Sequence, residues 1–220
     1  MENQIDTSGS NRSTAEGRRL WYVLGASGLL LVTIGGLVAW LPWHRQVQAI
    51  AEIERLGGSV VIHPAGPDWL RSIVGDEVMT GYDHVVYVDL FDTQVADAGL
   101  VHLRRLKRFE MLDLSMTQVT DAGLVHLKRL TKLETLNLTA TLVTDAGLVH
   151  LKGLKKLQNL ELWSTQVTDA GLVHLKGLTK LQTLILSDTQ VTDAGVVDLQ
   201  TALPKCEIQT HEDMPPTTAE

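Results

Sequence analysis

The stretch TQVTDAGLVHLKGLTKLQTLILSD, residues 165–188, follows two near-copies of itself in the chain. These copies begin at Thr117 and Thr141, and further opening threonines lie at Thr93 and Thr189, so the period is 24 residues throughout. A fixed period in this range is typical of a solenoid, in which each repeat forms one small unit. Because one unit cannot bury its own leucines, the units are expected to stack and share a single core.

Each copy combines the hydrophobic spacing of a strand with that of a helix. Near the end of residues 165–188, Leu184 and Leu186 alternate with other residues, which predicts a short strand. The preceding TDAGLVHLKGL has apolar residues at helical spacing, and Thr168 is expected to cap that helix with its hydroxyl. The predicted inward positions of this helix are Ala170, Leu172, Leu175 and Leu178.

The repeat resembles the leucine-rich repeat of the short, cysteine-containing subtype, as in bacterial proteins with tandem TDAGL units. The resemblance rests on L-x-x-L-x-L-x-x-T-x-V-T-D-A-G-L and covers residues 85–208. It implies an α/β fold, a right-handed βα horseshoe with a parallel sheet on its concave face. The chain departs from the subtype at Thr117, Thr141 and Thr165, where Cys or Asn is usual. A threonine hydroxyl can still hydrogen-bond the turn backbone, so the expected fold is unchanged.

A membrane span is predicted before the repeats. Leu20 to Trp43 contains no charged residue, and as a helix its 24 residues reach about 36 Å, against about 30 Å for the hydrocarbon core of a bilayer. We expect residues 20–43 to form an uncleaved transmembrane helix, with a secretory signal peptide as the alternative. Gly35 and Ala39 are spaced for weak helix–helix pairing.

The predicted orientation follows from the arginines that flank this span. Arg12, Arg18 and Arg19 precede it, whereas Arg45 and Arg55 follow it, and the more basic side tends to stay in the cytoplasm. A single-pass membrane protein is therefore expected, with the N-terminus cytoplasmic and the repeats periplasmic or otherwise extracytoplasmic.

Three further segments surround the span and the repeats. Residues 1–19 are rich in Ser, Asn and Thr and are expected to form a flexible tail. Residues 46–84 are expected to cap the solenoid with a helix from Gln46 to Leu56, a strand from Ser59 to Ile62 and a second short helix. Residues 209–220 are polar and contain prolines, so we expect a disordered C-terminal tail.

Catalytic, nucleic-acid and cofactor functions are not indicated. The net charge of −7 disfavours nucleic-acid binding. The sequence contains no phosphate-binding glycine loop and no metalloprotease or hydrolase motif, so we predict a non-catalytic protein without a cofactor. Four histidines recur with the repeat, but ligands of one zinc ion must converge on a single point, so a structural row is expected instead of a metal site. They are His102, His126, His150 and His174.

Acidic and basic rows also recur with the repeat. Asp169 and Lys176 represent them in one copy, at opposite ends of the predicted helix. Matching of the helix dipole and solubility explain both rows. The alternative is that the basic row meets anionic lipid head groups or an acidic envelope polymer. The basic positions are Arg104, Lys128, Lys152 and Lys176, with Arg108, Lys132, Lys156 and Lys180.

The outward strand positions vary most between copies, and they are expected to line the concave face. Trp163 is the only tryptophan in the repeats, and an exposed aromatic beside carboxylates and amides is typical of a binding hot spot. We hypothesise a membrane-anchored module that binds a protein, peptide or envelope ligand on this face. Neutral variation of a solvent-exposed surface is the other interpretation. The predicted site is Trp163, Glu161, Ile185 and Asn159, with Tyr87, Phe91, Met111 and Asp113 toward the N-terminal end.

Two alternatives to the binding function remain open at this stage. One is a structural spacer or scaffold at the membrane that has no specific ligand. The more remote one is an adaptor related to the F-box proteins of ubiquitin ligases, some of which carry repeats of this subtype. A predicted membrane span, and no F-box segment, precedes the present repeats.

Overall fold

The computed structural model describes residues 44–64, 83–106 and 109–210, together with residues 69, 72, 73 and 75. The predicted flexible tail, the predicted membrane helix with its orientation and Gly35–Ala39 pair, and most of the C-terminal tail lie outside this part. Within it, no helix has the length and apolar character needed to cross a bilayer. Residues from Arg45 onward form one structural unit.

Among the described residues, seven strands form one sheet in the order of the sequence. β1 (Ser59–His63) pairs antiparallel with β2 (His84–Asp89), and every later pair is parallel, which confirms the predicted parallel sheet. Leu112, Leu136 and Leu160 stand in register on adjacent strands. The later strands are β3 (Met111–Asp113), β4 (Thr135–Asn137), β5 (Asn159–Glu161), β6 (Thr183–Ile185) and β7 (Glu207–Gln209).

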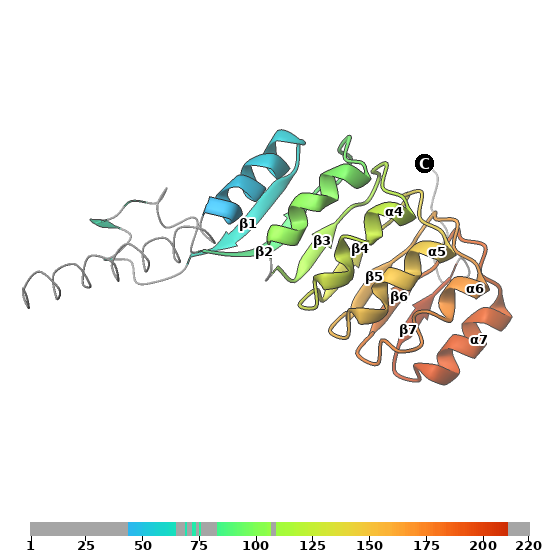
Figure 1. Cartoon of the computed structure of the whole chain (residues 1–220). Helices are drawn as coiled ribbons and strands as arrows, with labels where there is room; N and C mark the ends of the chain where they lie inside the picture. Colours follow the sequence, from blue (N-terminus) through green and yellow to red (C-terminus); the bar gives the residue numbers. More distant parts are fainter. Residues whose placement is uncertain are drawn as a thin grey trace, which may run out of the picture. The chain divides into compact units, whose positions relative to one another are not determined.

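Short helices follow the strands and lie together on one face of the sheet, as Figure 1 shows for α4 to α7. Most repeats contain only one α-helical turn, which continues in a 3-10 helix or a turn, because the chain must return to the sheet within 24 residues. The elements are η1 (Asp97–Arg105), α4 (Asp121–Leu124), η2 (Leu127–Arg129), α5 (Asp145–Leu148), η3 (Val149–Gly153), α6 (Asp169–Leu172) and α7 (Asp193–Ala202).

The N-terminal capping module is partly described. A helix over residues 44–55 agrees with the predicted helix, and β1 agrees with the predicted strand. Gly57 has a φ of +88° in the turn between them, a left-handed conformation that favours glycine. Ile53 from this helix is buried in the same core as the repeats, so the module covers the first repeat.

Leucines from the strands and helices form one continuous core between the two layers. Leu136, Leu160 and Leu184 are fully buried, as the stacking of repeats requires. The expectation for Ala170 was wrong, because Ala170 is exposed and Gly171 is buried in its place. A side chain at Gly171 would collide with the carboxylate of Asp145, so glycine is required there.

That carboxylate joins one repeat to the next. Oδ1 of Asp145 accepts a hydrogen bond from the backbone N–H of Thr168 at 2.8 Å, and Oδ2 accepts one from the Thr168 hydroxyl at 2.6 Å. The hydroxyl oxygen of Thr168 in turn accepts from the N–H of Ala170 at 3.2 Å, which confirms the predicted cap. The same contact recurs between Asp97 and Thr120, Asp121 and Thr144, and Asp169 and Thr192.

The threonines that replace Cys or Asn hold the turn after each strand. Thr141 donates its hydroxyl hydrogen to the carbonyl oxygen of Leu138 at 2.6 Å, and Thr117 and Thr165 make the same bond. The residue before each of these threonines has a left-handed backbone, with a φ of 53° at Ala140. The expected hydrogen bond from threonine to the turn backbone is therefore confirmed.

Candidate binding surface

The sheet face opposite the helices, here called the open face, carries the outward strand residues in rows. Strand register places Tyr87, Met111 and Thr135 in one row and Asp113, Asn137 and Glu161 in the next. A third row follows the strand ends, where backbone hydrogen bonds continue the pairing between repeats. Its members are Phe91, Ser115, Thr139, Trp163 and Ser187.

The third row contains two large exposed residues, and the small residues between them are buried. Phe91 and Trp163 are 54% and 45% exposed, whereas Ser115 and Thr139 between them are 4% and 9% exposed. The exposure predicted for Trp163 is therefore present. Because adjacent strands lie about 4.8 Å apart, three strand steps separate the two aromatic residues by about 14 Å.

The predicted site residues consequently fall into two groups. Glu161 is the last residue of β5, Trp163 lies two residues further along the chain, and Ile185 is the cross-strand partner of Glu161. Asn159, at the start of β5, completes the C-terminal group and donates to Thr135 Oγ1 at 3.2 Å. The N-terminal group comprises Tyr87 on β2, Phe91 just after β2, and Met111 and Asp113 on β3.

Most polar side chains of the open face bind their own backbone or a neighbour. Asp113 Oδ1 accepts from the N–H of Ser115 at 2.8 Å, and Asn137 Oδ1 accepts from the N–H of Thr139 at 2.9 Å. The carboxylate of Glu161 is different, because it makes no hydrogen bond or ion pair with any described residue. Glu161 is therefore the carboxylate that is available to a ligand beside Trp163.

The open face is acidic. Its first two rows contain Asp89, Asp113 and Glu161 but no lysine or arginine. Burial, and then the charge of Asp113, raises the pKa of Glu161 above its ordinary value. Burial, followed by the charges of Asp89 and Asp113, likewise raises the pKa of Tyr87. A cationic ligand would relieve the repulsion that these groups experience.

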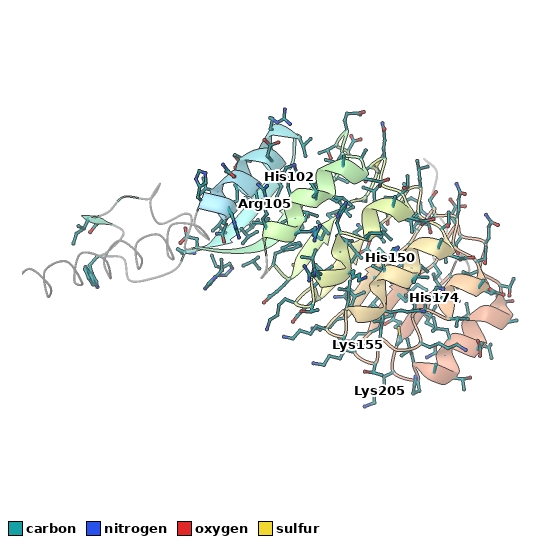
Figure 2. All side chains as sticks on the ribbon, in the orientation of Figure 1. His102, Arg105, His150, Lys155, His174 and Lys205 are labelled. Atoms are coloured by element: carbon teal, nitrogen blue, oxygen red, sulfur yellow. The ribbon has the colours of Figure 1, made fainter. Side chains whose placement is uncertain are left out.

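The described histidines of the helical side lie in a row and do not converge on one point. His102, His150 and His174 lie along the helices, half-buried (Figure 2). No group of three metal-binding side chains converges anywhere in the part of the chain that the structure describes. Cys206 is buried, and its pKa is raised to about 11 by burial and then by the charge of Glu207, so the thiol stays protonated.

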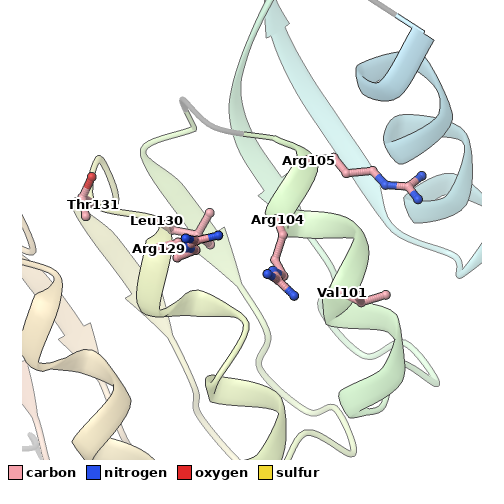
Figure 3. Close-up of a pocket in the computed structure, with 6 residues that line it drawn as sticks. All are labelled: Val101, Arg104, Arg105, Arg129, Leu130 and Thr131. Atoms are coloured by element: carbon pink, nitrogen blue, oxygen red, sulfur yellow. The ribbon is translucent and has the colours of Figure 1, made fainter. Parts of the chain in front are cut away.

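A second surface feature lies on the helical side, where η1 and η2 end. It is a depression of about 700 Å³ (Figure 3). Arg105 and Arg129 were not among the predicted site residues, although the sequence carries a signal for both: the matching positions in the next two copies are Gly153 and Gly177. The lining residues are Val101, Arg104, Arg105, Arg129, Leu130 and Thr131.

Comparison with known proteins agrees with this architecture. A family model described as Leucine Rich repeat matches residues 177–199. The leucine-rich-repeat ectodomain of a receptor kinase from Arabidopsis thaliana has a TM-score of 0.50 and 16% identity, over 76% of this chain and 91% of its own. The fold is a leucine-rich-repeat solenoid. A comparison with curated proteins gave no match.

Bacterial leucine-rich-repeat proteins are also similar in part. An internalin from Listeria monocytogenes shares 28% identity over 54% of this chain and 32% of its own, with a TM-score of 0.45. A leucine-rich-repeat protein of Leptospira interrogans shares 23% identity over 61% of this chain and 39% of its own, with a TM-score of 0.44. The chain thus matches only about a third of the length of each. The cysteine-containing subtype stays a prediction.

Proposed function

We propose that the protein is a non-catalytic interaction module whose open face binds a protein or peptide segment through Trp163. The observation that carries the proposal is the pairing of a half-exposed Trp163 with a carboxylate, Glu161, that has no internal partner. Tryptophan contributes a large share of binding energy where it can be covered fully by a partner. Ile185 and Asn159 extend this contact to the sides.

The chemistry of the open face indicates the kind of partner. A segment with a lysine or arginine next to an apolar side chain fits the pair, because the cation can neutralise Glu161 while the apolar group packs on Trp163. Tyr87, Phe91 and Met111, about three repeats away, form a second apolar contact for a longer segment. Solenoids commonly bind extended partners along such a surface.

Site-specific photocrosslinking tests the proposal in the full-length protein. A photoreactive phenylalanine replaces Trp163 in one variant and Val173 in the other, since Val173 is 54% exposed on the helical side. We expect a crosslinked partner from position 163 that is absent from position 173 and is strongly reduced by Glu161→Ala. The same crosslinks from both positions, or none from 163, would contradict the proposal.

We further propose that residues 20–43 anchor the module in a membrane, with the N-terminus in the cytoplasm. The uncharged sequence of this segment and the arginines before it support the placement. Protease added to spheroplasts is expected to digest the repeats and to spare a tag at the N-terminus. Digestion of the tag with protection of the repeats would reverse the orientation, and release of the protein by a carbonate wash would exclude the anchor.

A structural spacer is the second candidate, and one observation favours it. Several residues at and just before the strands bond one another: Asn159 donates to Thr135 at 3.2 Å, Gln158 to Glu134 at 2.8 Å and Gln182 to Gln158 at 3.2 Å. Such bonds stabilise the sheet without any ligand. The crosslinking experiment separates the two functions, because a spacer predicts no specific partner at position 163.

A further inference from the structure

The depression between the ends of η1 and η2 is lined by three arginines. In Figure 3 the side chains of Arg104 and Arg129 lie between the two segments, whereas Arg105 extends the other way, toward the N-terminal helix. None of the three forms an ion pair or a side-chain hydrogen bond with a described residue. Arg104 and Arg129 therefore bring two guanidinium groups without an internal partner to one depression.

The later repeats use their cations differently. Lys155 donates to the carbonyl oxygen of Gly177 at 2.8 Å, and Lys176 forms an ion pair with Asp198 at 2.7 Å. These bonds join neighbouring repeats, so the charges serve the fold. Other cations of the later repeats, Lys152, Lys156 and Lys180, form no such bond with a described residue, so what distinguishes Arg104 and Arg129 is their place in one depression.

Helix-dipole matching does not account for Arg105 and Arg129. Arg105 and Arg129 occupy a position that is glycine in the following two copies, Gly153 and Gly177, although the neighbouring sequence is almost unchanged. In the copy that has Gly153, the 3-10 helix η3 still ends at this place in the repeat. An arginine is therefore not needed to terminate the segment, and its presence calls for another explanation.

We propose that this depression binds a phosphate group. Guanidinium groups present paired N–H donors that match phosphate oxygens, and charge-assisted bonds of this kind are about twice as strong as neutral ones. Thr131, which is exposed, also lines the depression. A volume of about 700 Å³ accommodates a group larger than one phosphate, such as a diphosphate or a phosphorylated head group.

Calorimetric titration of the full-length protein with pyrophosphate tests this site. We expect saturable binding with one site per chain, weakened by added salt because exposed charges are screened. The variant Arg104→Gln, Arg129→Gly places glycine where later repeats already have it, and it is expected to bind at least about tenfold more weakly. The control Lys152→Gln, Lys180→Gln removes the same charge outside the depression and should change affinity by less than about twofold.

Two results would overturn the proposal: no saturable binding to the wild type, or an equal loss in the control variant. Thermal melting of both variants checks that each one folds. The phosphate could be free or carried by a lipid, so short-chain phosphatidic acid below its micelle concentration is titrated in parallel, with the matching phosphatidylcholine as the neutral reference. Competition between phosphatidic acid and pyrophosphate supports a lipid head group, whereas binding of pyrophosphate alone supports a soluble phosphate compound.

Discussion

Strand β5 carries two kinds of position that face opposite sides of the sheet. Leu160 is fully buried and matches the leucine at the same place in the neighbouring copies, whereas Glu161 has no counterpart of the same chemistry in β4 or β6. Stacking of the repeats requires a leucine at the first position and leaves the residue at the second position free to vary. The difference teaches that variation between repeats is informative only where the fold does not dictate the residue.

The largest expected effect separates these two kinds of position directly. Leu160→Ala removes a fully buried side chain and leaves a cavity, so the free energy of unfolding should fall by about 2–5 kcal/mol. Trp163→Ala, on the open face, should cost about 1 kcal/mol or less. Urea unfolding of both variants measures the two values, and equal losses would show that Trp163 is a core residue.

The carboxylates between repeats provide a second comparison. Asp145→Ala removes two hydrogen bonds to Thr168 and should lower the free energy of unfolding by about 1–3 kcal/mol. Asp193 occupies the same place in the last copy and is exposed, so Asp193→Ala should cost about 0.5 kcal/mol. Chemical denaturation distinguishes them, and a similar cost at both sites would assign the effect to the helix dipole.

Replacing alanine by glycine at two positions examines the turns, because the expected changes in stability have opposite signs. Ala140→Gly relieves a left-handed backbone, with a φ of 53°, and should stabilise the protein by about 0.5 kcal/mol after the entropy of the unfolded chain is counted. Ala146→Gly, in the right-handed α5, should destabilise it by about 0.5–1 kcal/mol. Melting temperatures that shift in the same direction would contradict this account of the turn.

The smallest effects concern pH. Hydrogen bonds from the backbone and then the side chain of Thr192 lower the pKa of Asp169, so its stabilising contribution is complete above the ordinary value of 3.8 and is lost as the pH falls through the lowered pKa. The pKa of Glu161 is raised, so its ionised form slightly destabilises the fold at neutral pH.

Two variants measure these opposite contributions. Asp169→Asn is expected to be less stable than the wild type at pH 7 and to approach it in acid. Glu161→Gln is expected to be slightly more stable at pH 7, with the gain disappearing as the pH falls through the raised pKa toward the ordinary value of 4.5. Thermal melts between pH 3 and pH 7 test both, and a stabilising ionised Glu161 would reveal an internal partner.

Periodicity alone predicted the stacked repeats, the parallel sheet and the exposure of Trp163, because a strand period of two fixes which residues face inward. The bonds from Asp145 to Thr168 were not predicted, because the two residues are 23 positions apart and only the stacking brings them together. The same closeness explains the error at Ala170, since glycine at 171 is required by a side chain from another repeat.

The candidate sites were likewise predicted only in part. The sequence predicted that Trp163 and Glu161 lie on one face. It did not give their distance from Phe91, which depends on the number of intervening strands. The sequence also has Arg129 where the next copy has Gly153. This signal is found only when the positions that depart from the repeat are compared as closely as those that match it. Which cations are used internally, such as Lys176, required the structure.

The most direct test of the central claim is hydroxyl-radical footprinting of the full-length protein, purified and in the cells that produce it. The account predicts fast oxidation of Trp163 in the purified protein and clear protection in cells, with unchanged oxidation of Val173 on the helical side. Equal oxidation of Trp163 in both conditions would contradict a bound partner on the open face.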